Sequence, residues 1–174
     1  MTVQKPKTMT KLIVGLGNPG KQYERTRHNA GYLAVDFLAK ELKLKWREDK
    51  KLGASIVRAD KIILAKPTKL MNNSGSVVTR LLKHFNIPQK NLTVVYDDVD
   101  LPLGELRLRE KGSSAGHKGM QSVIDQLQTT NLSRLKIGIG SPNIDTAEFV
   151  LRQFTAKEMT AVKAVLPQVI EMLL

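Results

Sequence analysis

The sequence predicts an α/β sandwich built on a mixed β-sheet with parallel strands at its centre. Two observations lead to this prediction. Short apolar runs bounded by Gly, Pro or Asp alternate along the chain with longer segments in which apolar residues recur every three to four positions. Helices that alternate with single strands or strand pairs favour such a sheet, and 174 residues are enough for one domain with a well-buried core.

Six short apolar or β-branched runs are the predicted strands. They are residues 11–16, 55–58, 61–66, 92–96, 105–110 and 134–139. The second and third runs are separated only by a short polar turn, Ala59-Asp60-Lys61, which predicts an antiparallel hairpin. We therefore expect a sheet that contains both parallel and antiparallel pairs.

Three segments carry the i, i+3, i+4, i+7 spacing of an amphipathic helix. They are residues 30–42, 77–85 and 120–127. Ser74 is the expected N-cap of the second helix. A fourth helix begins with a capping box formed by Thr155 and Glu158, and Pro167 is expected to kink or break it.

The excess of positive charge is the strongest signal in the composition. Lys and Arg number 28 against 16 Asp and Glu, and the net charge of +12 predicts a polyanionic partner, most often nucleic acid. Aromatic residues make up only 5% of the chain. We therefore expect contacts with phosphates rather than stacking on bases.

Several classes of protein are excluded by what the sequence lacks. Without cysteine there is no disulfide, zinc–thiolate site or cysteine nucleophile, which fits a reducing cytosol. No apolar run reaches the roughly 18 residues that a membrane span needs. Residues 1–10 are polar and lack the apolar segment of a secretory signal. We interpret 1–10 as a disordered extension and 11–174 as a single catalytic domain.

Polar side chains follow several of the predicted strands, at the point where each strand ends. Asn18 and His28 come after the first strand, Asn72 after the third, Asp97 after the fourth, and Lys118 in a loop before a later helix. Because the carboxyl ends of parallel strands open onto one crevice, we expect these side chains to share its rim. An imidazole there is suited to act as a general base, and a carboxylate to orient it.

Two well-known motifs are matched without their usual context. Residues 15–20 fit G-x-G-x-x-G, but a loop follows where a dinucleotide site needs a helix. Residues 112–116 fit G-x-S-x-G, but the last histidine, His117, lies on the same short loop, which breaks the order of an α/β-hydrolase triad. Three scattered histidines without an H-E-x-x-H pattern predict no metal site, and we expect no cofactor.

Six segments taken together identify a family. KLIVGLGNPG, TRHNAG, KLMNNSG, DDVDLPLG, GHKG and RLKIGIG occur in this order. In order and spacing they resemble the bacterial-type peptidyl-tRNA hydrolases, from about Lys11 to the C-terminus. The resemblance implies a monomeric, cytoplasmic enzyme with three α/β/α layers and no metal. It implies hydrolysis of the ester between a peptide and the 3′ ribose of tRNA, which frees the tRNA for translation.

The resemblance also implies roles for individual residues. His28 is expected to be the general base that activates water, and Asp97 to orient its imidazole and stabilise the imidazolium. Asn18 is expected to probe the amide of the peptide, which separates peptidyl-tRNA from aminoacyl-tRNA. Tyr23 and Asn72 are expected to contact the substrate, and Asn72 is also a candidate to polarise the ester carbonyl.

Further residues extend the expected substrate surface. The resemblance implies that Met71 lines the crevice and that Arg109 and Lys136 bind tRNA phosphates, in agreement with the positive charge of the chain. Residues 145–154 resemble the mobile lid of the family.

Two positions depart from the pattern of the family. Leu70 stands where an aromatic residue commonly precedes Met-Asn, so some contact with the substrate is lost. Lys118 replaces the usual asparagine of Gly-His-Asn-Gly. An ammonium group cannot accept a hydrogen bond. It can instead bind a phosphate near the 3′ end of the tRNA or, if close enough, act electrostatically on His28. We expect the phosphate contact.

Two other functions stay open from the sequence. One is an RNA-binding relative that keeps the fold and the charge with little or no hydrolysis. The base and its orienting acid argue against it, because binding alone requires neither. The other is a nucleotide-dependent oxidoreductase, which binding of NAD or NADP would reveal.

Overall fold

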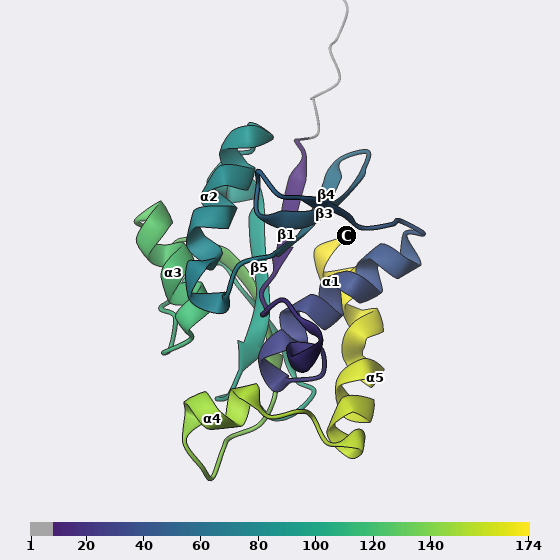
Figure 1. The fold of residues 1–174 in the computed structure, drawn as a ribbon, viewed down its shortest axis with the longest axis vertical. Helices are drawn as coiled ribbons and strands as arrows, with labels where there is room; N and C mark the ends of the chain where they lie inside the picture. Colours follow the sequence, from purple (N-terminus) through teal and green to yellow (C-terminus); the bar gives the residue numbers. More distant parts are fainter. Residues whose placement is uncertain (1–8) are drawn as a thin grey trace, which may run out of the picture.

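The computed structural model describes residues 9–174, which form three layers (Figure 1). A mixed sheet of seven strands is the middle layer. One face carries α2 (Ser74–His84) and α3 (Lys118–Leu127), and the other carries α1 (Ala30–Glu41) and α5 (Ala156–Leu173). The predicted three-layer sandwich is confirmed. The predicted extension at 1–10 falls, up to residue 8, outside the described residues.

The order of strands in the sheet is β2-β3-β4-β1-β5-β7-β6. The strands are β1 (Lys11–Gly15), β2 (Arg47–Asp49), β3 (Ala54–Ala59), β4 (Ile62–Pro67), β5 (Leu92–Asp98), β6 (Leu106–Arg109) and β7 (Ser133–Gly138). The central strands β4, β1, β5 and β7 are parallel, whereas β2, β3 and β6 are antiparallel to their neighbours. The predicted hairpin forms between β3 and β4, with Asp60 at a φ of 41° in its turn.

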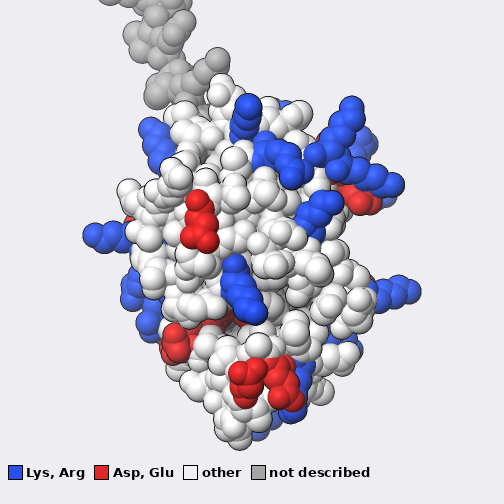
Figure 2. All heavy atoms as spheres, turned by 60° about the vertical axis from the view of Figure 1, so that its left-hand side comes forward, with Lys and Arg blue, Asp and Glu red and all other residues white. Residues whose placement is uncertain are grey.

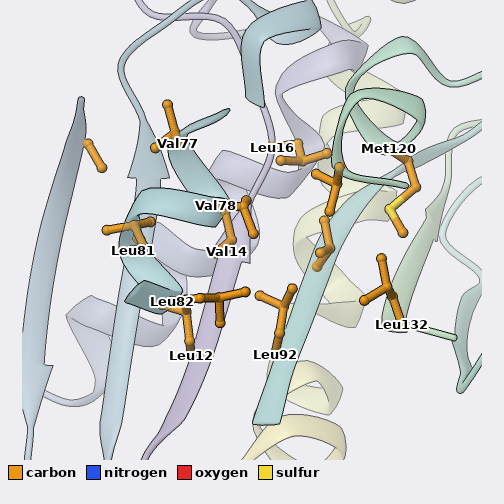
Figure 3. Packing of buried hydrophobic residues seen from close by; sticks show 14 of the residues in the cluster. Leu12, Val14, Leu16, Val77, Val78, Leu81, Leu82, Leu92, Met120 and Leu132 are labelled. Atoms are coloured by element: carbon orange, nitrogen blue, oxygen red, sulfur yellow. The ribbon is translucent and has the colours of Figure 1, made fainter. Parts of the chain in front are cut away.

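Both faces of the sheet are buried, because successive strand residues point to opposite faces. Leu12 and Val14 of β1 join α2 and α3 in one apolar cluster, while Ile13 joins α1 and α5 in the other. Figure 3 shows Val78 and Leu82 of α2 beside Val14 and Leu12 of β1, with Met120 of α3 farther across the same face. This burial fixes the strands, so that polar groups gather at their ends.

Short turns and one short helix connect these elements within residues 9–174. They are η1 (Lys21–Tyr23), η2 (Arg27–Asn29), η3 (Met71–Asn73), η4 (Gln89–Asn91) and α4 (Thr146–Leu151). The sequence did not predict α4 or β2. A six-residue helix and a three-residue strand are too short to show a reliable period.

Three details of the predicted helices are wrong. Pro167 does not break α5, because it lies on the exposed side, where water can bind the carbonyl that loses its donor. Ser74 is not an N-cap but the first residue of α2, and its hydroxyl donates to the Met71 carbonyl at 2.6 Å. Lys118, expected in a loop, is the first residue of α3.

A close crossing of α1 over β1 brings the turn after β1 onto the end of β5. A Cβ atom on Gly31 would lie 2.3 Å from the carbonyl oxygen of Val95 and 2.6 Å from that of Leu16. A Cβ atom on Gly15 would lie 2.3 Å from the carbonyl oxygen of Gly31. Glycine at both positions permits this approach. As a result His28, three residues before Gly31, sits at the end of β5.

We expect Gly31→Ala to destabilise the fold by about 1–3 kcal/mol, because the added methyl group must displace backbone rather than a flexible side chain. In a domain of this size the Tm would fall by roughly 2–12 °C, measured by thermal unfolding. Gly140→Asn is the control, since a Cβ there meets nothing within 4 Å and Asn tolerates a positive φ. Equal Tm values for the two variants would contradict the tight crossing.

Candidate active site

A cavity of about 730 Å³ opens at the carboxyl ends of the parallel strands. Turns after β1, β4 and β5, the start of α3 and one side of α4 form its walls. Eight predicted site residues line it: Asn18, Tyr23, His28, Leu70, Met71, Asn72, Asp97 and Lys118. Arg109 and Lys136 do not. The fold therefore brings together, at the strand ends, residues that lie far apart in the sequence.

His28 and Asp97 are hydrogen-bonded to each other at the base of this cavity. The Nδ1 atom of His28, in η2, lies 2.9 Å from Oδ2 and 3.1 Å from Oδ1 of Asp97, near the end of β5. Asp97 is only 2% exposed. Because a carboxylate only accepts, the ring proton sits on Nδ1 and the lone pair on Nε2. That Nε2 has no hydrogen-bond partner among residues 9–174.

A second imidazole holds the other side of the carboxylate. His117 Nε2 lies 2.8 Å from Oδ1 of Asp97, and the backbone N–H of Met120 donates to His117 Nδ1 at 3.1 Å. The proton of His117 is therefore on Nε2 and points at Asp97. The rings of His28 and His117 lie 4.8 Å apart. Sequence reasoning did not assign His117 to the site, although its place in the GHKG segment was an available signal.

Asp97 is held in its ionised form. Burial raises the pKa of this carboxyl, but the imidazoles of His117 and His28 outweigh burial and bring the pKa well below its usual range. Tyr96 packs its ring 4.7 Å from that of His117, and burial raises the pKa of Tyr96 to about 12, so its hydroxyl is neutral. Asp97 can therefore stabilise a positive charge that forms on His28.

Asn18 is oriented by its neighbours so that it offers donors to the cavity. Its Oδ1 accepts the backbone N–H of Met71 at 2.8 Å. The Asn29 side chain bonds the backbone of Asn18 twice, accepting from its N–H at 2.8 Å and donating to its carbonyl at 2.9 Å. The side-chain NH₂ group of Asn18 makes no hydrogen bond within the described residues, which leaves it available to an acceptor on a ligand.

The sequence matches known proteins over nearly its whole length. The family model for peptidyl-tRNA hydrolase matches residues 12–174. The chain belongs to the peptidyl-tRNA hydrolase family. It is 44% identical to a peptidyl-tRNA hydrolase of Aquifex aeolicus (strain VF5) over 169 residues, 94% of this chain and 88% of that one.

Two more members of the peptidyl-tRNA hydrolase family extend this similarity. The protein of Lactococcus lactis subsp. cremoris (strain MG1363) is 49% identical over 138 residues, 77% of this chain and 73% of that one. The crystal structure of peptidyl-tRNA hydrolase from Acinetobacter baumannii has a TM-score of 0.85 and 30% identity, and the match covers 94% and 88% of the two chains.

The three basic residues that are expected to bind tRNA phosphates lie in different surroundings. Lys118 is exposed on the cavity rim and has no ion pair among residues 9–174. The Nζ atom of Lys136 lies 3.2 Å from Oδ2 of Asp98. Arg109 lies on the edge strand β6 opposite Arg134, toward the end of β7 remote from the cavity. Of the three, Lys118 alone is at the cavity.

The remaining predicted residues form the rim and wall of the cavity. Tyr23 is half-buried at the end of η1. Met71 is buried, whereas its neighbours Leu70 and Asn72 are exposed, Leu70 to 53%. The segment from 70 to 72 therefore anchors itself through one side chain and presents two to the opening.

Two other kinds of chemistry are disfavoured by the contacts. The Ser114 hydroxyl lines the cavity but donates to Gln121 Oε1 at 2.6 Å instead of meeting an imidazole. His28, Asp97 and His117 place one possible metal-ligand atom each within 4.8 Å of one another. Both imidazoles, however, turn protonated nitrogens to the carboxylate, and a metal requires bare ones. Hydrogen bonding accounts for this cluster without an ion.

Asp97 should contribute to stability in a pH-dependent way. A carboxyl with a depressed pKa stabilises the fold above its unfolded pKa of about 4, and this contribution is lost as the pH falls toward the folded pKa. We expect Asp97→Asn to have a lower free energy of unfolding than the wild type at about pH 5. The difference between the two proteins should become smaller as the pH falls to about 3. Urea unfolding at each pH measures it.

The control for this experiment is Asp60→Asn. Asp60 is exposed in the β3–β4 turn, where asparagine tolerates the positive φ. We expect its stability to follow the wild type at every pH. If the gap between the wild type and Asp97→Asn stayed constant with pH, the paired carboxylate would not be its source.

Proposed function

We propose that this chain hydrolyses the ester between a peptide, or an N-blocked amino acid, and the 3′ ribose of tRNA. The His28–Asp97 pair carries the proposal, with 2.9 Å between ring nitrogen and carboxylate and a second ring nitrogen without a protein partner. Membership of the peptidyl-tRNA hydrolase family supports the same class of reaction.

His28 acts as the general base in this proposal. Its Nε2 takes a proton from water as the water oxygen attacks the ester carbonyl, and Asp97 stabilises the imidazolium that results. Asn72, on the rim, donates to the carbonyl oxygen as negative charge develops there. The bond to the ribose oxygen then breaks, and the proton moves from Nε2 to that oxygen. The products are a carboxylic acid and a tRNA with a free 3′ hydroxyl.

Asn18 distinguishes a blocked amino group from a free one. Its NH₂ group donates to a carbonyl oxygen, which the peptide bond of peptidyl-tRNA supplies. An aminoacyl-tRNA has an ammonium or amine at that place and offers no carbonyl acceptor. A site built to pair with an acceptor rejects a substrate without one, because its polar group is then left unpaired. Tyr23, Leu70 and Met71 form the wall beside the peptide.

The tRNA is bound mainly through its phosphates. The net charge of +12 attracts a polyanion. Lysine and arginine side chains are spread over the face in Figure 2. Acidic ones lie among them, and several stand near its lower end, where Figure 1 places α4. In this proposal Lys118 binds a phosphate near the 3′ end. Arg109 binds a phosphate farther along the tRNA, and Lys136 does so by exchanging Asp98 for a phosphate.

We further propose that the protein works in the cytoplasm, because its substrate is a product of translation. We also propose that it works as a monomer. The large apolar side chains exposed among the described residues are Met9, Leu70, Leu151 and Leu174. Two of them, Leu70 and Leu151, line the cavity. Little apolar surface is then left for a permanent dimer. No helix in residues 9–174 has both the length and the apolar character of a membrane span.

The direct test is the release of N-acetyl-amino acid from N-acetyl-aminoacyl-tRNA, beside the unacetylated ester on the same tRNA. We expect rapid cleavage of the acetylated ester alone. His28→Ala is expected to lower the rate about 10²–10⁴-fold, the usual effect of removing a positioned base. His84→Ala is the matched control, since His84 is exposed on α2 outside the cavity, and should keep full activity.

Other results would decide against parts of the proposal. Tight, salt-sensitive binding of tRNA with no cleavage of either ester would indicate the RNA-binding relative, which neither the geometry nor the comparisons favour. A loss of less than about threefold in His28→Ala would mean that another group is the base. Equal cleavage of both esters would rule out the role given to Asn18.

Lys118→Asn should weaken substrate binding and at the same time stabilise the fold. A cation at the first position of α3 is unfavourable for the helix dipole by about 0.3–1 kcal/mol, so its loss should raise the stability. Loss of one phosphate contact should raise KM and lower the slope of log KM against log salt by about 0.7–0.9. Lys163→Gln, on the exposed side of α5, controls for charge. Unchanged KM and salt slope would exclude a phosphate contact.

A further inference from the structure

Arg27 directly precedes His28, and its buried side chain has no part in the proposed chemistry. Its Nη2 atom lies 2.7 Å from Oε1 and 3.2 Å from Oε2 of Glu158, and its Nη1 donates to the carbonyl oxygen of Phe149 at 3.1 Å. The guanidinium carbon lies 4.1 Å from the centre of the Phe149 ring. One cation thus joins η2, α4 and α5.

Glu158, the partner of this cation, is itself fixed in place. Its Oε1 accepts the backbone N–H of Thr155 at 2.9 Å, and its own N–H donates to the Thr155 hydroxyl at 3.1 Å. Burial raises the pKa of Glu158, but the hydrogen bonds from Thr155 and Arg27 outweigh it and lower the pKa. The carboxylate is therefore an ionised, oriented acceptor at the start of α5.

Backbone contacts run beside the side-chain contacts of Arg27. The N–H of Arg27 donates to the carbonyl of Arg152 at 3.1 Å, and the N–H of Phe154 donates to the carbonyl of Arg25 at 2.9 Å. Thr26 and Gln153 form an isolated antiparallel bridge between these bonds. The segment before His28 and the connection from α4 to α5 are therefore paired like two short strands.

α4 is the shortest of the five α-helices described within residues 9–174. It has six residues, too few to be stable by themselves, and its side chains are largely exposed apart from Val150. Thr146, Ala147, Val150 and Leu151 nevertheless line the cavity that holds His28. The position of this wall relative to His28 is thus set where α4 meets Arg27.

We propose that Arg27 is a positioning residue for the ester hydrolysis, an inference that rests on the proposed function. Arg27 holds the α4 wall at a fixed place relative to His28, so that a peptide bound against α4 presents its ester to Nε2. Removal of the cation leaves Glu158 with only the N–H of Thr155 as a donor, and the Phe149 carbonyl with only the N–H of Arg152. The wall then moves away from the base while His28 and Asp97 keep their own hydrogen bond.

Arg27→Met tests the proposal, with Arg152→Met as the matched control. Arg152 belongs to the same segment, but within residues 9–174 its exposed side chain pairs only with Glu148 of α4 itself and does not join α4 to η2 or α5. Both variants lose one positive charge near the cavity, and only the first loses the attachment of α4. We expect Arg27→Met to raise KM about 10-fold or more relative to the control, because hydrogen bonds to charged groups are lost.

Further readouts separate positioning from general stability. We expect kcat to change less than about threefold and the shape of its pH profile to stay the same, because the His28–Asp97 pair is intact. Arg27→Lys should recover part of the KM, since an ammonium group still pairs with Glu158. KM values within about twofold of the control, measured well below both Tm values, would overturn the proposal even if Arg27→Met were less stable.

Two further measurements test the proposal if Arg27→Met does not fold or if no activity can be measured. If Arg27→Met does not fold, Glu158→Gln weakens the same contact from a half-buried position, and an unchanged KM there would overturn the proposal. Hydrogen exchange at residues 146–151 needs no activity. We expect clearly faster exchange in Arg27→Met and a smaller increase in Arg152→Met, which loses only an exposed ion pair within α4. Absence of turnover in the wild type would refute the proposed function, whereas equal exchange in both variants would refute the attachment.

Discussion

The buried carboxylate of Asp97 is the group on which the arrangement of the site depends. A charge removed from water costs several kcal/mol unless donors surround it. The donors here are the imidazoles of His28 and His117, which stand 69 and 20 residues from Asp97 in the sequence. Three segments of chain must therefore meet at one point. The parallel centre of the sheet allows this, since Gly15 at the end of β1 pairs beside Val95 of β5.

The same hydrogen bonds that stabilise the carboxylate also prepare the chemistry. Each imidazole gives Asp97 a protonated nitrogen, which fixes its tautomer. For His28 this leaves the lone pair of Nε2 to accept a proton from water. The backbone N–H of Met120 occupies the free nitrogen of His117, so only one of the two rings can act as a base. The difference between the two histidines is therefore decided by the first turn of α3.

Much of the fold could be predicted from the sequence, and the failures have physical causes. Apolar runs such as that of β5 are buried on both faces, so they stand out without reference to their neighbours. By contrast, α4 has only six residues, and its contact with Arg27 comes from a distant part of the sequence, so no period within the helix can reveal it. α5 does not end at Pro167, where a kink or break was predicted, because this side of the helix is open to water, which can bind the carbonyl that loses its donor.

The candidate site shows the same division between local and tertiary information. That polar side chains gather at strand ends follows from parallel strands alone. Which donor or acceptor atom each side chain presents to the cavity does not follow from the parallel strands alone. The direction of the Asn18 amide depends on the N–H of Met71, 53 residues away, and the pairing of Lys136 with Asp98 depends on the register of β5 with β7.

The net charge alone does not tell which basic residues are available to a polyanion, because the fold pairs some of them. Lys136 is paired with Asp98 and Arg27 with Glu158, so neither is free to meet a polyanion without giving up a partner. Arg134 is fully buried on three carbonyl oxygens and serves the fold. Each ion pair neutralises one acidic residue as well as one basic residue, however. The excess of positive charge is therefore unchanged and stays on the outside. Charge outside attracts the nucleic acid, while the paired charge inside holds the elements around the base in place.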